Sequence, residues 1–321
     1  MDTGPNPQIC KRDKARMNIY YHPKYNIDLG LLNKLHPFDG LKFSKIFEVL
    51  KDKPDINIVE PKNPIPQVVI DEYVGHLLRR LLHSKRYILN ALELPFIPII
   101  PFSLIDKKLL LPMRWAVNGT LESMKKALSG INCWNLSGGF HHASRDSAEG
   151  FCVYNDIGIA HKEHLKSSDL DKDDRILIID VDAHHGNGNA HTFMENANVT
   201  IIDIFNDDIY PKSSFTKKRV NISVPLHNNT IGPEYLKSLE AALNKIDGSY
   251  RIAIVVAGTD VLSSDPLGGL ALTVTDVVNR DGIIFEKLKK MSIPVVYLGG
   301  GGYSRESVNA TSESISKLYN Q

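Results

Sequence analysis

Cysteine is scarce in this sequence of 321 residues, which contains only Cys10, Cys133 and Cys152. No C-x-x-C pair is present, which argues against both a disulfide framework and a cysteine-rich structural zinc site. Sparing cysteine use of this kind is typical of a reducing compartment. We therefore predict a cytoplasmic protein and leave nuclear entry open for a eukaryotic source.

Long apolar runs are absent as well. The best candidate, residues 94–104, contains three prolines and falls short of the ~20 apolar residues that a membrane-spanning helix needs. The basic residues near the N-terminus are not followed by an apolar segment, so no signal peptide is expected. We predict no membrane span, a flexible polar arm over residues 1–16 and one domain over residues 17–321.

A surplus of either charge is also missing, since 38 basic side chains face 37 acidic ones and the formal net charge is +1. This balance excludes the broad basic surface of a nucleic-acid-binding protein, and no direct nucleic-acid partner is expected. Hydrophobic residues make up 42% of the chain, which is enough to build a large buried core.

What the sequence does contain is an alternation of strand-like and helix-like segments. Five apolar, β-branched runs are typical of buried parallel strands: Ile131–Leu136, Arg175–Val181, Val199–Phe205, Arg251–Ala257 and Ile293–Leu298. Apolar residues at three- or four-residue spacing predict helices over Met113–Leu128, Tyr235–Ile246 and about Thr275–Met291, with Gly282 a weak point in the last. The alternation predicts an α/β fold, a three-layer α/β/α sandwich with a mainly parallel central sheet. The proline-rich segment Pro61–Pro66 is expected to be a surface loop.

Polar side chains follow four of these strands at the point where each strand ends. In open α/β sheets ligands bind beyond the carboxyl ends of the strands, so we expect these side chains to share one site. They are His141 and His142 after the first strand, Asp180, Asp182, His184 and His185 after the second, Asp260 after the fourth and Tyr303 after the fifth.

Asp182 and His184 have the residue types and the spacing of metal ligands. Two residues apart in extended chain, they point to the same side. Asp260 would supply a third ligand from another strand, and three protein ligands with one open position form a catalytic zinc site. A lone D-x-H pair is more often a solvated turn, so the prediction depends on the other strand ends. His185 faces away and is expected to be a structural residue.

The adjacent histidines, His141 and His142, suit an amide hydrolase, which needs a base to deprotonate water and an acid to protonate the leaving amine. Asp180 and Asn187 are candidate partners that would fix the tautomers of the two rings. Tyr303 follows four glycines and would donate its O–H to a developing oxyanion. A phosphate-binding loop is the rival interpretation of these glycines, but neither G-K-[ST] nor G-x-G-x-x-G is present there.

Together these segments resemble the histone deacetylase family, specifically its class IV branch. The similarity extends from about Asn18 to Leu318, and several long motifs in the same order make it specific. The motifs are HPFDGLKF at His36–Phe43, GGFHHASRDSAEGFCVYND at Gly138–Asp156, IIDVDAHHGNGNAHTF at Ile178–Phe193, IIDIFNDDIYP at Ile201–Pro211, AGTDVLSSDPLGGL at Ala257–Leu270 and LGGGGY at Leu298–Tyr303.

The resemblance implies the arginase/deacetylase-like fold, one zinc ion per chain and an acylated lysine of a protein or peptide as the substrate. The zinc ligands implied by the motifs are Asp182, His184 and Asp260, and the implied catalytic residues are His141, His142 and Tyr303. The residues expected to support them are Asp180, Asn187 and Asp265. The residues expected to line the acyl-lysine tunnel are Gly150, Phe151, Tyr210, Leu267 and Gly301.

Two positions depart from the better-known class I pattern. Asn187 replaces the aspartate behind the second histidine, and Asp203 replaces a serine at a monovalent-cation site. An amide stabilises imidazolium less than a carboxylate does, so the basicity of His142 is expected to be lower. The resemblance also implies a structural K⁺ site, but the change to Asp203 makes this implication weaker than that of the zinc site.

In the mechanism that we expect, His142 is both base and acid, and His141 is mainly electrostatic because Asp180 favours its cationic form. The acyl group of the substrate can be acetyl or a long fatty-acyl group, and a small acylated amine such as an acetylpolyamine is an alternative substrate. A non-catalytic binding protein of the same fold is a further alternative, although no ligand, histidine or tyrosine is missing. An arginase-like dimetal hydrolase would need extra aspartates where His141, His142 and Asn187 stand. The oligomeric state is not predicted.

Overall fold

The computed structural model describes residues 17–28, 30, 38–54 and 56–319, so the arm predicted over residues 1–16 lies outside the described residues. At its centre is a sheet of eight parallel strands in the order β2-β1-β3-β8-β7-β4-β5-β6. The strands are β1 (Asn18–Tyr20), β2 (Asn57–Val59), β3 (Cys133–Asn135), β4 (Ile176–Asp180), β5 (Val199–Asn206), β6 (Ile222–Leu226), β7 (Ile252–Val256) and β8 (Val295–Leu298).

The five predicted strands are all present, as β3, β4, β5, β7 and β8, and the described sheet is parallel throughout rather than mainly parallel. Three further strands were not predicted. β1 and β2 have three residues each, which is too short for a periodic pattern. β6 is an edge strand of alternating burial that contains Pro225, a residue that sheets tolerate at an edge.

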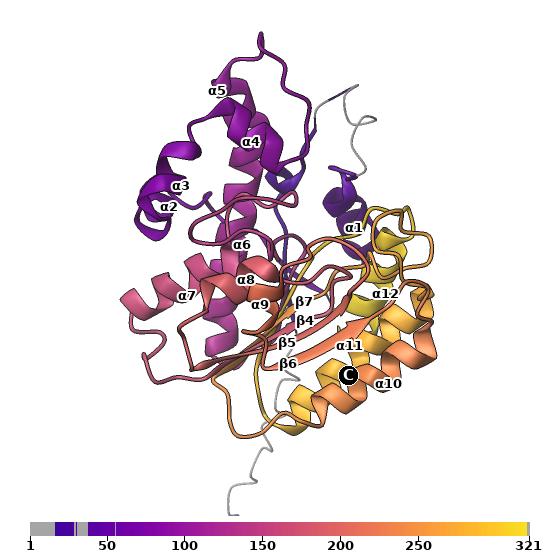
Figure 1. Cartoon of the computed structure of the whole chain (residues 1–321). Helices are drawn as coiled ribbons and strands as arrows, with labels where there is room; N and C mark the ends of the chain where they lie inside the picture. Colours follow the sequence, from indigo (N-terminus) through magenta and orange to yellow (C-terminus); the bar gives the residue numbers. More distant parts are fainter. Residues whose placement is uncertain (1–16, 29, 31–37, 55, 320–321) are drawn as a thin grey trace, which may run out of the picture.

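Helices cover both faces of the sheet (Figure 1). On one face, apolar side chains of the covering helices pack with Leu177 and Ile179 of β4, and on the other they pack with Ile176 and Ile178. Successive side chains of a strand point to opposite faces, so one continuous apolar run serves both layers. The covering helices are α1 (Lys42–Leu50), α10 (Gly232–Leu243), α11 (Val274–Lys290) and α12 (Ser307–Tyr319) on the first face, and α6 (Leu111–Leu128), α7 (Asp156–Lys166) and α8 (Asn187–Thr192) on the second. The three-layer α/β/α sandwich is confirmed.

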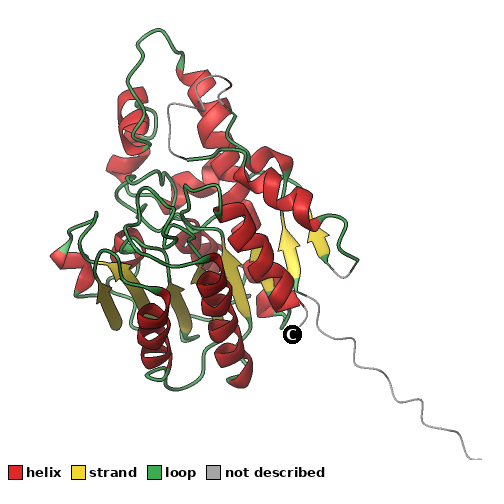
Figure 2. Cartoon of the chain, turned by 90° about the vertical axis from the view of Figure 1, so that its right-hand side faces the viewer, coloured by secondary structure: helices red, strands yellow, loops and turns green. Residues whose placement is uncertain are grey.

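A third apolar cluster lies among short helices that stand above the sheet (Figures 1 and 2). It is joined to the sandwich by Met113 and Val117, in the N-terminal half of α6. The predicted loop Pro61–Pro66 leads into this region and is anchored by the buried Ile65. The short helices are α2 (Gln67–Tyr73), α3 (His76–Leu81), α4 (Lys85–Ala91), α5 (Phe102–Ile105) and the π-helical turn η3 (Asp106–Leu110); η1 (Pro23–Tyr25) and α9 (Ser214–Lys217) lie elsewhere.

The three predicted helices are present as α6, α10 and α11. α10 ends at Leu243, shortly before the predicted Ile246. Gly282 does not interrupt α11, which begins with a capping box between Thr273 and Asp276. Within the described part of the chain, no helix is both long and apolar enough to cross a membrane.

Candidate active site

Four neighbouring strands in the middle of the sheet carry the candidate site. β3, β8, β7 and β4 are adjacent in the sheet although β3 and β8 are far apart in the sequence. Parallel strands place their carboxyl ends at one edge, so the segments that follow them meet there. Those segments are 136–142 after β3, 299–303 after β8, 257–260 after β7 and 181–187 after β4.

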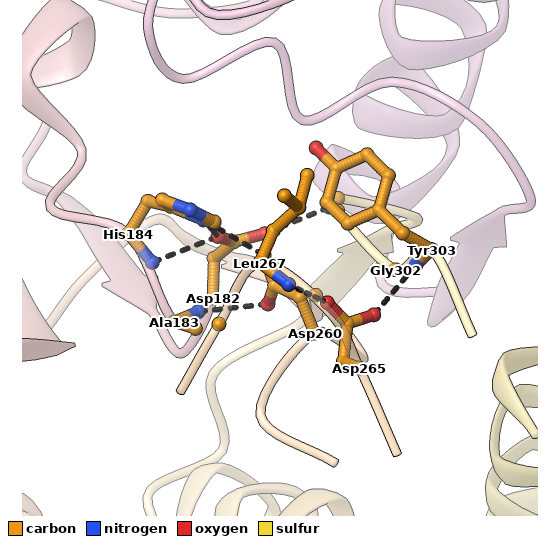
Figure 3. A network of polar contacts seen from close by, with 12 residues as sticks. Asp182, Ala183, His184, Asp260, Asp265, Leu267, Gly302 and Tyr303 are labelled. Carbon is orange, nitrogen blue, oxygen red and sulfur yellow. Dashed lines mark hydrogen bonds and ion pairs between the residues drawn. The ribbon is translucent and has the colours of Figure 1, made fainter. Parts of the chain in front are cut away.

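Asp182, His184 and Asp260 come together as a cluster of potential metal ligands. Each offers one ligand atom, and these atoms lie within 4.8 Å of one another. His184 Nδ1 lies 3.1 Å from Asp182 Oδ1 and 2.9 Å from Asp260 Oδ2. Both carboxylates are completely buried, and His184 is 9% exposed. Figure 3 shows the three side chains close together, with Tyr303 beside them.

Backbone amides hold the two carboxylates of this cluster in place. Ala183 N donates to Asp260 Oδ1 over 2.8 Å, and Gly301 N donates to Asp182 Oδ2 over 2.7 Å. Position 301 has no room for a side chain, because a Cβ there would lie 2.5 Å from Asp260 Oδ2. Only glycine therefore brings the backbone amide close enough to support Asp182.

The charges and donor types of the cluster fit a divalent cation. Burial alone would lower the pKa of His184, but hydrogen bonds to Asp182 and Asp260 outweigh it and raise that pKa to about 10. Two buried carboxylates thus stabilise positive charge strongly at this point. Two carboxylates and an imidazole are ligands that zinc accepts, and a fourth position would remain for water or substrate. The cluster could hold one metal ion, and that ion would displace the proton of His184.

His141 is paired with a carboxylate. Its Nδ1 lies 2.9 Å from Asp180 Oδ2, and its Nε2 lies 3.7 Å from Asp182 Oδ1. Burial lowers the pKa of His141, but the carboxylates of Asp180 and Asp182 outweigh burial and raise it to about 9. A histidine that stays cationic near neutral pH suits an electrostatic role better than that of a base.

His142 has a neutral partner. Its Nδ1 lies 2.7 Å from Asn187 Oδ1, and both side chains are buried. Burial, together with the nearby rings of His141 and His184, holds the pKa of His142 well below its usual value. Since Nδ1 is engaged by Asn187, Nε2 is the nitrogen that can exchange a proton with a substrate or water.

Tyr303 enters the site from the glycine-rich segment after β8. Its backbone N–H donates to Asp265 Oδ2 over 2.7 Å, which fixes the segment below the ring (Figure 3). The ring centroid lies 6.3 Å from that of Phe38 and 5.7 Å from that of Phe151. Burial and the nearby carboxylates keep the pKa of Tyr303 well above its usual value, so the phenol keeps its proton and can donate it in a hydrogen bond.

A cavity of about 980 Å³, counted with its opening to solvent, lies against the two histidines and Tyr303. Much of its lining is apolar, and it reaches as far as the N-terminal half of α6. Apolar residues that line it include Ile27, Leu92, Leu94, Leu109, Met113 and Ala116.

The predicted tunnel residues separate into two groups. Gly150, Phe151 and Gly301 line this cavity, whereas Tyr210 and Leu267 are not among the described residues that line it. Tyr210 is 44% exposed and packs edge-on against the second histidine ring, and Leu267 is partly buried in the loop after β7. A motif places a residue near a site, but the wall that it forms depends on the path of the loop and the direction of the side chain.

His185 lies away from the cluster, as its position in an extended strand end predicted. Its Nδ1 lies 2.5 Å from Asp203 Oδ2, and its Nε2 lies 2.9 Å from Thr216 Oγ1. The other oxygen of Asp203, Oδ1, is buried and has no hydrogen-bond partner among the described residues. A buried carboxylate oxygen in this state is chemically suited to contact a cation.

Lys42 is a residue of the site that the sequence did not single out. From α1 its buried Nζ donates to the backbone carbonyl of Gly301 over 3.2 Å and lies 3.4 Å from those of Gly300 and Gly302. Burial lowers the pKa of Lys42 by more than nearby carboxylates such as Asp260 raise it. The lysine ties the glycine segment to α1. Its place within HPFDGLKF was the only signal, because lysine on a helix is usually solvated.

A family model and a relative of similar length both show the family of this chain. The family model "Histone deacetylase domain" matches residues 67–318. Histone deacetylase 2 of Arabidopsis thaliana is 31% identical over 312 residues, which cover 96% of this chain and 80% of the relative. The acetoin utilization protein AcuC of Bacillus subtilis is 28% identical, and the match covers 88% of this chain and 76% of that protein.

One of the most similar solved structures is the crystal structure of an HDAC homolog complexed with SAHA. It has a TM-score of 0.71 and 20% sequence identity to this chain, and the match covers 96% of this chain and 85% of that one. At this level of identity, the match shows that the two proteins share a fold.

Proposed function

The chain belongs to the histone deacetylase family of hydrolases, and on that basis we propose that it is a zinc-dependent, class IV-like deacylase of lysine side chains in proteins or peptides. The observation that carries the proposal is the cluster of Asp182, His184 and Asp260 beside His142 and Tyr303, next to an apolar cavity. A metal site, a base and a hydrogen-bond donor for an oxyanion are the parts that amide hydrolysis requires.

Each polar residue of the site has a separate task in this proposal. The three ligands would hold zinc, which when bound polarises the amide carbonyl and lowers the pKa of water. His142 takes a proton from the attacking water at Nε2 and returns it to the leaving lysine amine. Tyr303 donates its O–H to the oxyanion that develops on the carbonyl oxygen. His141, kept cationic by Asp180, adds positive charge beside this oxyanion.

We further propose that long acyl groups are substrates as well as acetyl. The support is the apolar lining of the cavity, which extends past the histidines to Met113 and Ala116 of α6. Each methylene group that leaves water for such a lining contributes about 0.8 kcal/mol. An acyl chain that lies in this part of the cavity would therefore bind more tightly than acetyl.

One assay tests these proposals together. A peptide carrying acetyl-, octanoyl- or myristoyl-lysine and a free acetylpolyamine are compared as substrates, and metal is measured in the same sample. We expect turnover of the peptides, a higher kcat/KM for long acyl groups and about one zinc per chain. Turnover of the polyamine alone would favour a small-amine deacylase, and a content of two manganese ions per chain would favour an arginase-like enzyme. If the zinc-loaded protein turned over none of the substrates, the proposed enzymatic activity would be refuted and a binding function would be favoured.

A change in the cavity tests the acyl-length proposal by itself. Ala116→Leu places a larger side chain in the part of the cavity at α6 and so reduces the space there. The substitution should lower kcat/KM for myristoyl-lysine about tenfold or more, while kcat/KM for acetyl-lysine is affected much less. Because Ala116 is buried in the core, acetyl-lysine turnover by the same variant is the control for folding. Equal losses on both substrates would count against an acyl chain in this part of the cavity.

The structural K⁺ ion near Asp180, Asp182 and His184 remains a proposal of the family resemblance, and the cytoplasmic location remains a proposal from the sparing use of cysteine. Asp203 Oδ1 is the buried oxygen that would suit such an ion. If K⁺ binds, replacing Na⁺ by K⁺ at constant ionic strength should raise Tm. An unchanged Tm would argue against the site, and cell fractionation would test the location.

A further inference from the structure

The neutral partner of His142 is itself held by a carboxylate. Asn187 Oδ1 lies 2.7 Å from His142 Nδ1, and Asn187 Nδ2 donates to Glu149 Oε1 over 2.7 Å. His142 is 5% exposed and Asn187 is 8% exposed, while Glu149 is partly buried. The three side chains therefore form a continuous chain of hydrogen bonds that begins at the proposed base.

A tight turn fixes the position of Glu149. The backbones of Glu149 and Cys152 exchange hydrogen bonds of 3.0 and 2.9 Å, and the two residues between them, Gly150 and Phe151, have φ values of 54° and 64°. Two successive residues at positive φ are the mark of a type I′ turn. The turn packs directly on the imidazole, because a Cβ at Gly150 would lie 2.5 Å from His142 Cδ2.

The direction of these hydrogen bonds decides which nitrogen of His142 carries the proton. A carboxylate has no hydrogen to donate, so Glu149 can face only the NH₂ group of Asn187, and Oδ1 is left for His142. An oxygen acceptor requires a hydrogen on Nδ1, which leaves the lone pair of Nε2 available to take a proton.

An amide without such a carboxylate could turn over and present its NH₂ group to Nδ1. The neutral imidazole would then carry its hydrogen on Nε2 and could not act as a base there. When an amide replaces the carboxylate behind a catalytic histidine in a serine protease, the wrong tautomer lowers kcat by about 10⁴-fold. Asn187 brings the same hazard to this site.

We propose that Glu149 is a positioning residue that locks the Asn187 amide and thereby keeps His142 in the tautomer with its hydrogen on Nδ1. The inference rests on the proposed function, because it concerns the proposed base of that reaction. An aspartate at position 187 would itself be an acceptor for His142 Nδ1. With Asn187 in that position, the acceptor is the amide oxygen, and the Glu149 carboxylate behind it keeps that oxygen turned toward the imidazole.

Kinetics of Glu149 variants give the first test. Glu149→Ala should lower kcat about 10- to 100-fold, with KM little changed and zinc content equal to that of the unsubstituted protein. Glu149→Gln, whose amide can accept from Asn187 but can also donate to it, should recover only part of the activity. Glu195→Ala, at an exposed carboxylate, is the matched control and should leave kcat unchanged. Full activity of Glu149→Ala would overturn the proposal.

A second substitution gives a result that a merely structural role would not produce. In Asn187→Asp the partner of His142 can only accept, so the tautomer no longer depends on Glu149. Adding Glu149→Ala to Asn187→Asp should therefore cost no activity, and loss of the repulsion between two carboxylates could raise it. An equal loss in both backgrounds would contradict the proposal.

The Tyr210 hydroxyl also forms a hydrogen bond with Glu149, so its contribution must be separated. Glu149→Ala should lower kcat by the same factor in the Tyr210→Phe background as in the unsubstituted protein. If it has no further effect there, Glu149 acts through Tyr210 and the proposal is overturned.

The tautomer itself can be observed without turnover. In metal-free protein with ¹⁵N-labelled histidine, the Nδ1 resonance of His142 should be that of a protonated nitrogen, and Glu149→Ala should shift it toward the value for a nitrogen without hydrogen. An unchanged resonance would refute the inference even if the enzyme is active. If instead no acyl substrate is hydrolysed but the resonance shifts as expected, the proposed function fails and the positioning role stands.

Discussion

At the scale of single residues, two histidines that are adjacent in the sequence have opposite protonation behaviour. His141 faces the carboxylate of Asp180 and has a pKa raised to about 9, whereas the pKa of His142, which faces Asn187, is held well below its usual value. Burial lowers both pKa values, so the difference is produced by the neighbouring groups, and the two hydrogen-bond partners lie about 40 residues away in the chain. The adjacent pair could be identified from the sequence, and its partners were named there, but the chain of support beyond Asn187 was not.

Removal of one phenol oxygen tests the role of Tyr303. Tyr303→Phe keeps the ring that packs against Phe38 and Phe151 but removes the proposed donor to the oxyanion. We expect kcat to fall about 100-fold or more while zinc content stays the same. Steady-state kinetics with metal analysis measure both, and unchanged turnover would exclude Tyr303 from the mechanism.

Removal of one ligand tests the metal site. Asp182→Ala leaves two of the three ligands in the cluster, and we expect bound zinc to fall from about one to less than about 0.1 per chain, with activity lost. Asp208→Ala removes a carboxylate that is bound to His227 and Asn228 instead and should keep its zinc. A fully metallated, active Asp182→Ala protein would disprove the ligand assignment.

At the scale of elements, the sequence predicted long and strongly patterned segments and missed short ones. β4 and β7 are buried on both faces, so their apolar runs were visible, whereas β1 and β2 gain their regularity only from pairing with neighbours. The same limit applies to the site. Lys42 and Glu149 act on glycine and amide groups distant in the chain, and no local pattern shows where a side chain will reach.

Gly282 offers a test at this scale because a glycine inside a helix normally costs stability. A Cβ at position 282 would lie 3.5 Å from the end of the flexible Lys317 side chain, which is an ordinary contact, and α11 is unbroken there. Gly282→Ala should therefore raise the free energy of unfolding by about 0.5–1 kcal/mol. Urea denaturation measures it, with unchanged activity as the control. A destabilised variant would mean that this buried position needs glycine for packing.

At the scale of the whole molecule, burial of one histidine makes stability depend on pH. His161 packs against Phe193. Burial is the main cause that lowers the pKa of His161 to about 4, and the charge of the nearby His164 is the second cause. Between pH 4 and the value of about 6.5 for an unfolded histidine, the unfolded chain binds a proton that the folded chain does not. The stability contributed by neutral His161 is therefore complete above about pH 6.5, and it is lost as the pH falls toward 4.

A substitution separates this contribution from that of other groups. His161→Phe keeps an aromatic ring beside Phe193 and should flatten the dependence of unfolding free energy on pH by up to about 3 kcal/mol between pH 7 and pH 4. Denaturation at several pH values measures the slope. An equal slope in His161→Phe and the unsubstituted protein would contradict the assignment.

The position of β8 has a consequence for how the molecule is completed. β8 is the last of the described strands along the chain, yet it lies between β3 and β7 and is the only one of them that joins β2-β1-β3 to β7-β4-β5-β6. Before it is in place, the segment that bears the paired imidazoles and the segments that bear the carboxylates belong to separate half-sheets. Assembly of the site must therefore wait until Val295–Leu298 has been synthesised, however early its other components are made.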